Sequence, residues 1–185
     1  MTKIEQIEIP LSKLKLSLML AGSNAFVALG AWFIMKPKEI SMQGVHASPV
    51  QIFIVGIVSI LFFGLCTTFI FKKIIDNTPG LVINNNGIND NSGGTSVGLI
   101  LWKDIKEIKE LTVANQNFIM IIVNNPDEYI NKENSFIKRK TMEINYKTYQ
   151  SPISISANGL KCNFDELYKI IVDAFKANNT PQVEV

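Results

Sequence analysis

The sequence predicts an α+β protein in which a two-helix transmembrane hairpin is followed by a small β-sheet domain closed by a C-terminal amphipathic helix. Three observations lead to this fold class. Two long runs without a charged residue occupy positions 16–35 and 50–71. Short β-rich runs separated by Asn, Gly and Pro follow them, as is typical of a small sheet. The stretch 163–179 then carries apolar residues at helical spacing.

The composition agrees with an integral membrane protein. The chain has 185 residues, of which 47% are hydrophobic and 18% are charged, and its mean hydropathy is +0.19. This apolar excess is larger than a soluble domain of that length needs. The net charge of +2, from 18 basic and 16 acidic residues, is too small to recruit nucleic acid or an acidic substrate. Nucleic acid is therefore not an expected partner.

Both uncharged runs are long enough to cross a bilayer. Residues 16–35 cover 20 positions and residues 50–71 cover 22, and at about 1.5 Å per residue each reaches across roughly 30 Å of hydrocarbon. Buried core helices are one alternative, but a core helix normally keeps a polar face, which neither run has. A cleaved signal peptide is the alternative for the first run. Its length and the charged segment 36–38 that follows it favour a retained span.

The loop between the runs, residues 36–49, is short, so the two helices are expected to be antiparallel with both chain termini on one side. Basic residues at the ends of a hairpin favour the cytoplasm. Five lysines flank those ends and two lie in the loop: Lys3, Lys13, Lys15, Lys72 and Lys73 against Lys36 and Lys38. Cys66 and Cys162 are too differently placed to pair, which suits a reducing compartment. Cytoplasmic termini are therefore predicted.

Small residues at four-residue spacing predict how the two spans pack. In the first run these are Ser17, Ala21 and Ala25, and in the second Gly56 and Gly64 flank Ile60. Small side chains let helix backbones approach closely. We expect contact within the hairpin, although the same surfaces suit dimerisation. Asn24 alone is too little polar chemistry for a transport site.

Beyond the spans, turn residues alternate with short strands. Strands are expected at 81–83 and 88–90, joined through Asn86-Gly87, and at 99–102 after the polar loop 91–98. Apolar residues in 104–113 fit a helix better than a strand, and the pattern leaves both open.

The second half of the domain mixes strands and helices. The apolar run 118–123 predicts a buried strand, and a helix is expected to start at 125–128 and to occupy part of 133–148. Ile153 and Ile155 predict another strand. Asn163 caps the last helix, whose apolar stripe is Leu167, Ile170, Ile171, Ala174 and Phe175. The expected organisation is an N-terminal segment 1–15, the hairpin 16–73, the domain 78–179 and a tail 180–185.

Four segments carry a resemblance to a known family. They are Gly80 to Ile108, Ile9 to Lys13, Asn125 to Tyr129 and Tyr149 to Ile153. The chain resembles an uncharacterised family of bacterial inner-membrane proteins in which a transmembrane hairpin precedes a pleckstrin-homology-like (PH-like) domain. The resemblance implies a PH-like β-roll, a location in the cytoplasmic membrane, and a strand at 103–113 because such domains carry a Trp-x-Asp-Ile step there. It transfers no catalytic residue.

A search for reactive groups predicts no catalytic set, cofactor or metal site. Gly93 and Gly98 have P-loop spacing but lack the Lys and Ser or Thr that bind phosphate and magnesium. His46 is the only histidine and lies in the loop between the spans. Asp165 and Glu166 are expected to complement a helix dipole. A third-ranked hypothesis, an enzyme, would need a cleft built from Asp90, Asp104 or Glu107.

The expected function is a non-enzymatic membrane module whose domain binds a protein partner or its own copy. The alternative is an anionic-lipid sensor. Its headgroup contacts would come from two basic clusters, Lys72 and Lys73 beside the membrane and Lys138, Arg139 and Lys140 in the domain. Residues 72–185 nevertheless hold as many acidic as basic side chains, so a solvated face is the favoured interpretation of the second cluster.

Overall fold

The computed structural model describes residues 6–42 and 47–179. It contains two units: a helical hairpin, Lys13–Asn77, and a domain made of the residues up to Ser12 and from Thr78 onward. Three sequence predictions concern positions outside the described residues, namely Lys3 as a basic flank, His46 in the loop and the tail 180–185.

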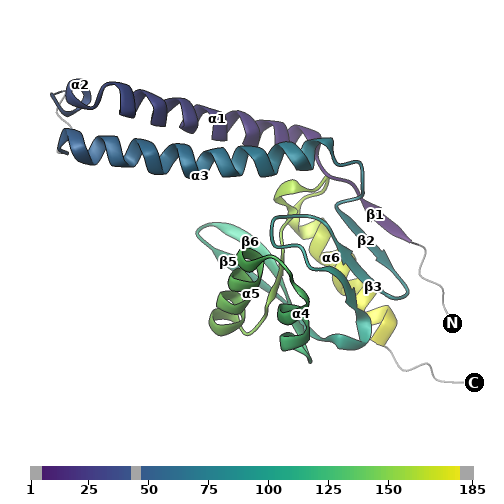
Figure 1. The fold of residues 1–185 in the computed structure, drawn as a ribbon. Coiled ribbons are helices and arrows are strands. Elements are labelled where there is room, and N and C mark those ends of the chain that lie inside the picture. Colours follow the sequence, from purple (N-terminus) through teal and green to yellow (C-terminus); the bar gives the residue numbers. More distant parts are fainter. Residues whose placement is uncertain (1–5, 43–46, 180–185) are drawn as a thin grey trace, which may run out of the picture. The chain divides into compact units, whose positions relative to one another are not determined.

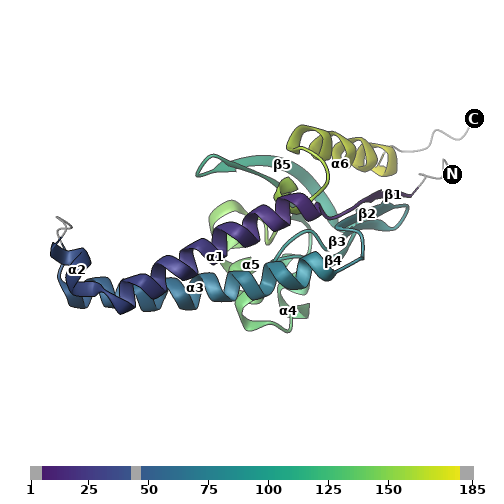
Figure 2. The ribbon, with the colours of Figure 1, turned by 90° about the horizontal axis from the view of Figure 1, so that it is seen from above.

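The hairpin consists of two long helices, α1 (Lys13–Met35) and α3 (Pro49–Ile75), which lie side by side (Figures 1 and 2). Both are long and apolar enough to cross a membrane, as predicted. In the most apolar stretch of each helix 11% of the residues are buried, so the side chains do not form the core of a globule. A short helix, α2 (Pro37–Met42), occupies part of the predicted loop.

Local sequence explains where α3 begins. Ser48 and Gln51 form a capping box: the Ser48 hydroxyl accepts from the Gln51 backbone N–H, and the Gln51 side chain accepts from the Ser48 N–H. Pro49 stands at the first helical position, where its missing N–H removes no hydrogen bond.

The closest approach of α1 and α3 lies at two glycines. A Cβ built on Gly30 would be 2.9 Å from the Gly56 carbonyl oxygen, and one built on Gly56 would be 2.7 Å from the Gly30 oxygen. Ala21 and Ala25 are instead exposed on α1, and nothing lies within 4 Å of a Cβ at Gly64. The helix contact therefore uses Gly30 and Gly56, because at about 100° per residue Ala21 and Ala25 fall on the opposite side of α1 from Gly30.

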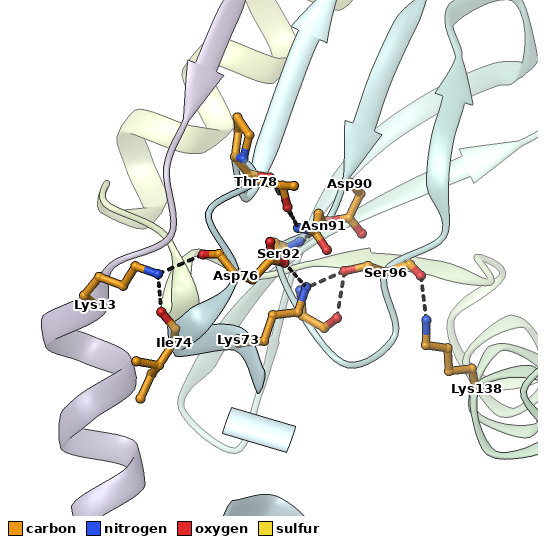
Figure 3. Close-up of polar contacts among 12 residues, drawn as sticks. Lys13, Lys73, Ile74, Asp76, Thr78, Asp90, Asn91, Ser92, Ser96 and Lys138 are labelled. Carbon is orange, nitrogen blue, oxygen red and sulfur yellow. Dashed lines mark hydrogen bonds and ion pairs between the residues drawn. The ribbon is translucent and has the colours of Figure 1, made fainter. Parts of the chain in front are cut away.

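Polar side chains inside the hairpin find partners there. The hydroxyls of Ser23 and Thr67 are 2.9 Å apart, and the Ser59 hydroxyl donates to the Phe26 carbonyl oxygen at 3.0 Å. Such bonds between helices satisfy groups that hydrocarbon cannot. At the other end, the Lys13 ammonium donates to the carbonyl oxygens of Ile74 and Asp76 and so joins the start of α1 to the end of α3 (Figure 3).

The domain contains two antiparallel sheets. The first has four strands in chain order, β1 (Ile7–Ile9), β2 (Leu81–Asn84), β3 (Gly87–Asp90) and β4 (Gly98–Leu101). Ile83, Ile88 and Ile100 stand opposite one another across β2, β3 and β4 and are fully buried. Together they form the first half of the core.

The second sheet has three strands, β5 (Ile105–Val113), β6 (Gln116–Val123) and β7 (Ile153–Ile155), again in chain order. Most of the ambiguous segment 104–113 is thus a strand, which begins at Ile105, whereas Lys103 and Asp104 belong to the 3₁₀ turn before it. Ile105 and Ile108 are three positions apart yet share a face, because the pairing of β5 with β6 shifts register between Ile105 and Glu107. Ile119 and Ile121 of β6 face Ile155 and Ile153 of β7, and all four are buried.

Helices complete the domain. The predicted helices after residue 125 are α4 (Pro126–Lys132) and α5 (Phe136–Tyr149), and α5 contacts β7. The C-terminal helix α6 (Phe164–Asn179) is capped as predicted, because the Asn163 side chain accepts from the Glu166 N–H at 2.8 Å. Leu167, Ile171 and Ala174 are its buried residues. Trp102, in the short 3₁₀ turn Trp102–Asp104 between the sheets, donates to the Asn84 carbonyl oxygen and contacts Phe175 of α6.

The N-terminal segment contains a strand for which the sequence gives no prediction. Ile7–Ile9 pair with Leu81–Ile83, and the Pro10 carbonyl oxygen accepts from Lys161 N–H. Three residues give too short a pattern for a strand to be recognised. The hairpin is therefore an insertion between two paired strands of one sheet (Figure 1).

We expect Gly56→Ala to destabilise the hairpin by about 1–3 kcal/mol, because the added methyl group has no space against the Gly30 carbonyl. Gly64→Ala is the matched control, since no atom lies within 4 Å of its Cβ. Thermal unfolding of the full chain in mild detergent measures both. Equal melting temperatures for the two variants would contradict the assigned helix contact.

Candidate functional site

A pocket of about 160 Å³ opens in the domain between β4 and α4. Its walls combine apolar and polar side chains. Leu99 and Leu101 of β4 supply the apolar part, and Leu99 is 41% exposed. The polar lining comes from the 3₁₀ turn and from α4 with the residue before it: Asp104, Asn125, Glu128, Tyr129 and Lys132.

Tyr129 organises this pocket. Its hydroxyl donates to Asp104 Oδ2 at 2.8 Å and accepts from the Leu101 N–H at 3.2 Å. Burial raises the pKa of Tyr129 from 10 to about 12, the Leu101 N–H opposes the rise, and the hydrogen bond and charge of Asp104 add to it. Tyr129 therefore stays protonated at neutral pH and fixes both α4 and the edge strand β4.

Asn125 leaves one hydrogen-bonding group unused. Its Nδ2 donates to Glu128 Oε2 at 2.7 Å, but its Oδ1 is buried and has no hydrogen-bond partner. A buried carbonyl oxygen without a donor costs about 1–3 kcal/mol. The Asp104 and Glu128 carboxylates, which also line the pocket beside Lys132, suit a ligand group that donates hydrogen bonds.

The predicted basic residues of the domain do not act as one cluster. Lys138 points inward, where its ammonium donates to the Ser96 carbonyl oxygen at 3.3 Å and lies 3.7 Å from Glu133 (Figure 3). Arg139 and Lys140 are exposed on α5. Lys140 is hydrogen-bonded to Glu143 at 2.9 Å, and this bond lowers the pKa of the Glu143 carboxyl. The three residues are separated because successive positions on a helix point about 100° apart.

The basic residues at the end of the hairpin also differ from each other. Lys72 is exposed, whereas the Lys73 ammonium lies 3.8 Å from the Asp76 carboxylate within the same helix end. Lysines in the last turn of a helix complement its dipole. Both positions are thus explained locally by the C-terminus of α3.

The carboxylates named for the enzyme hypothesis lie in different surroundings. Of Asp90, Asp104 and Glu107, only Asp104 lines the pocket. Asp90 accepts from the backbone and hydroxyl of Ser92 in its own turn, and Glu107 forms an exposed ion pair with Lys109. Within residues 6–42 and 47–179, no group of three or more His, Cys, Asp or Glu side chains is placed to hold a metal ion.

Sequence reasoning missed the pocket. Asn125, Glu128 and Tyr129 are recognised in the sequence only as the start of a helix, and Asp104 only as a surface acid. The signal in the sequence was a Tyr and an Asn at the start of that helix. Each carries a polar group that needs a hydrogen-bond partner when the residue is buried.

Comparison with protein-family models, with curated proteins and with solved structures finds no match.

We expect Tyr129→Phe to lower the free energy of unfolding of the domain by about 1–3 kcal/mol, because Asp104 and the Leu101 N–H then lose a buried partner. The change in Trp fluorescence of the full chain during urea unfolding measures it. Tyr146→Phe on α5, where no hydrogen bond of the hydroxyl contributes to the pocket, is the control. The assigned role fails if the two substitutions cost the same.

The raised pKa of Tyr129 also predicts how stability depends on pH. The folded pKa of about 12 lies above the unfolded value of 10, so the folded state holds the proton more tightly. The resulting stability is complete below pH 10 and is lost as the pH rises from 10 toward 12. Chemical unfolding at a series of alkaline pH values should show a loss that is smaller in Tyr129→Phe. A loss of equal size in the variant would assign it to other groups.

Proposed function

We propose that this chain is a non-enzymatic membrane protein in which the hairpin anchors a PH-like domain at the cytoplasmic face of the inner membrane. There the domain binds a protein partner or a second copy of the chain. The insertion of the hairpin between the paired strands β1 and β2 carries this proposal. Both ends of the hairpin continue into strands of the same sheet. The anchored hairpin therefore keeps the domain close to the membrane, where it meets its partner.

The form of the domain supports the PH-like assignment. Two antiparallel sheets of four and three strands, each in chain order, are followed by a C-terminal helix that buries its apolar stripe. This is the outline that the resemblance in the sequence implies. The helices α4 and α5 between β6 and β7 are an addition to it.

The pocket between β4 and α4 is the proposed contact with the partner. Its apolar wall of Leu99 and Leu101 suits the methylene stem of a long side chain, and the carboxylates of Asp104 and Glu128 suit a charged head that donates hydrogen bonds. A Lys or Arg side chain of a partner protein, or of a second copy, has both parts.

The alternative, sensing of anionic lipid through Lys138, Arg139 and Lys140, is weakened in that form. The Lys138 ammonium donates to the Ser96 carbonyl oxygen and lies 3.7 Å from Glu133, so a headgroup has to compete with both partners.

Anchoring and orientation predict a simple fractionation result. The full chain should stay with the membranes after alkaline carbonate extraction, and a fluorescent reporter fused after Val185 should be active while an alkaline phosphatase fused there is inactive. Release by carbonate would refute the anchoring. An active phosphatase would refute the cytoplasmic orientation alone.

If the pocket binds the partner, a substitution in its lining should abolish binding without lowering the stability of the domain. We expect Asn125→Leu to change the unfolding free energy little, because removal of the unpartnered buried oxygen offsets the loss of the Asn125–Glu128 hydrogen bond, while binding is lost because the pocket lining changes. A photo-crosslinking residue in place of Leu99 in cells should give a discrete crosslinked product that disappears with Asn125→Leu. The same crosslinker at Lys169, exposed on α6, is the control. A Leu99 product that persists in Asn125→Leu would rule out the pocket as the contact.

A further inference from the structure

The helix α5 presents large apolar side chains to the outside. Phe136 is 71% exposed, Ile137 is 74% exposed and Ile144 is 54% exposed. At 100° per residue these three fall on one side of the helix, opposite the fully buried Met142. We refer to Phe136, Ile137, Lys140, Ile144 and Lys147 as the outer face of α5.

Positive charge accompanies the apolar side chains. The helix has four basic residues and one acidic residue, Glu143, whose charge is matched by Lys140. Arg139 and Lys147 are exposed beside the apolar residues. Lys140 and Lys147 lie between Phe136 and Ile144 on this face, and Arg139 lies at its edge. Long basic side chains can extend their charged ends to lipid phosphates while their stems stay beside apolar groups, as in segments that lie in the interface of an anionic membrane. The domain as a whole has nearly equal numbers of acidic and basic residues, so the excess of positive charge is a local feature of α5.

Contacts inside the domain connect α5 with the point where the hairpin is attached. Thr78 is three residues past the end of α3, and its hydroxyl accepts from the Asn91 side chain at 2.7 Å (Figure 3). Asn91 begins the loop that contains Ser96, and the Ser96 carbonyl oxygen accepts from Lys138 in the first turns of α5. Thr78 and the N-terminal end of α5 therefore both contact the loop that follows β3.

We infer that the outer face of α5 lies in the headgroup region of the anionic leaflet that anchors the chain. Phe136, Ile137 and Ile144 enter the boundary with the acyl chains, while Arg139, Lys140 and Lys147 contact lipid phosphates. The inference rests on the proposed membrane anchoring and adds a lipid surface as a second ligand of the domain, separate from the pocket. Lys138, one of the predicted headgroup ligands, is replaced in this role by Lys147.

The test places a nitroxide label at Ile137→Cys in the full chain carrying Cys66→Ser and Cys162→Ser. The protein is reconstituted in liposomes of phosphatidylcholine, with or without phosphatidylglycerol. Collision of the label with oxygen, which is concentrated in lipid, is compared with collision with a water-soluble nickel complex. A label at Asp173→Cys, exposed on α6, is the control.

We expect oxygen to dominate at position 137 in phosphatidylglycerol liposomes and the nickel complex to dominate at position 173. Replacing Arg139, Lys140 and Lys147 by Gln should lower the equilibrium constant for seating on those liposomes by about a hundredfold, from roughly 1 kcal/mol per basic residue. Replacing Lys161, Lys169 and Lys176 by Gln removes the same charge elsewhere and should have little effect. High salt should act like the first triple variant.

A label at 137 that collides mainly with the nickel complex would overturn the inference, because the face is then in water. A label shielded from both reagents would also overturn it, because a protein copy then covers the face. Carbonate extraction of the same liposomes keeps the two proposals apart. Release of the chain would refute the anchoring itself, whereas a retained chain with a water-exposed label refutes only the role of α5.

Discussion

The pairing of β1 with β2 is the constraint on which the rest of the structure depends. Ile9 stands opposite Leu81, and the whole hairpin lies between them in the chain. Antiparallel partners in a ladder are about 5 Å apart, so the two ends of the hairpin are held together from the side of the domain. The Lys13 ammonium, bonded to the carbonyl oxygens of Ile74 and Asp76, holds them together from the side of the helices. Contacts in the domain and contacts in the hairpin thus each bring together the two chain segments that join the units.

Much of the fold could be predicted because its signals are local and long. Two uncharged runs mark α1 and α3, and the cap at Asn163 with its apolar stripe marks α6. Short strands and edge strands were harder to predict from the sequence. The segment β1 has too few residues to show a period, and β5 carries Ile105, Ile108 and Leu111 at a spacing closer to that of a helix. Family resemblance, rather than periodicity, indicated that β5 is a strand.

The candidate site was harder to predict from the sequence, because it depends on how each helix is rotated about its axis and on which segments contact one another in the folded chain. Small residues at Ala21 and Ala25 satisfy a spacing rule, but which face of α1 meets α3 is settled by Gly30 and Gly56. Likewise, three consecutive basic residues look alike in a sequence, whereas on α5 one points into the domain and two point outward. The orphan oxygen of Asn125 arises only when α4 folds against β4.

The position of β1 ahead of the hairpin also bears on biogenesis. This strand leaves the ribosome first, and its partner β2 is made only after both long helices. Direct closure of a chain segment of that length carries an entropic penalty, which falls once α1 and α3 have paired and brought their outer ends together. Pairing of α1 with α3 therefore favours completion of the four-stranded sheet, and a chain in which the two helices stay apart leaves β2 with an unpaired edge.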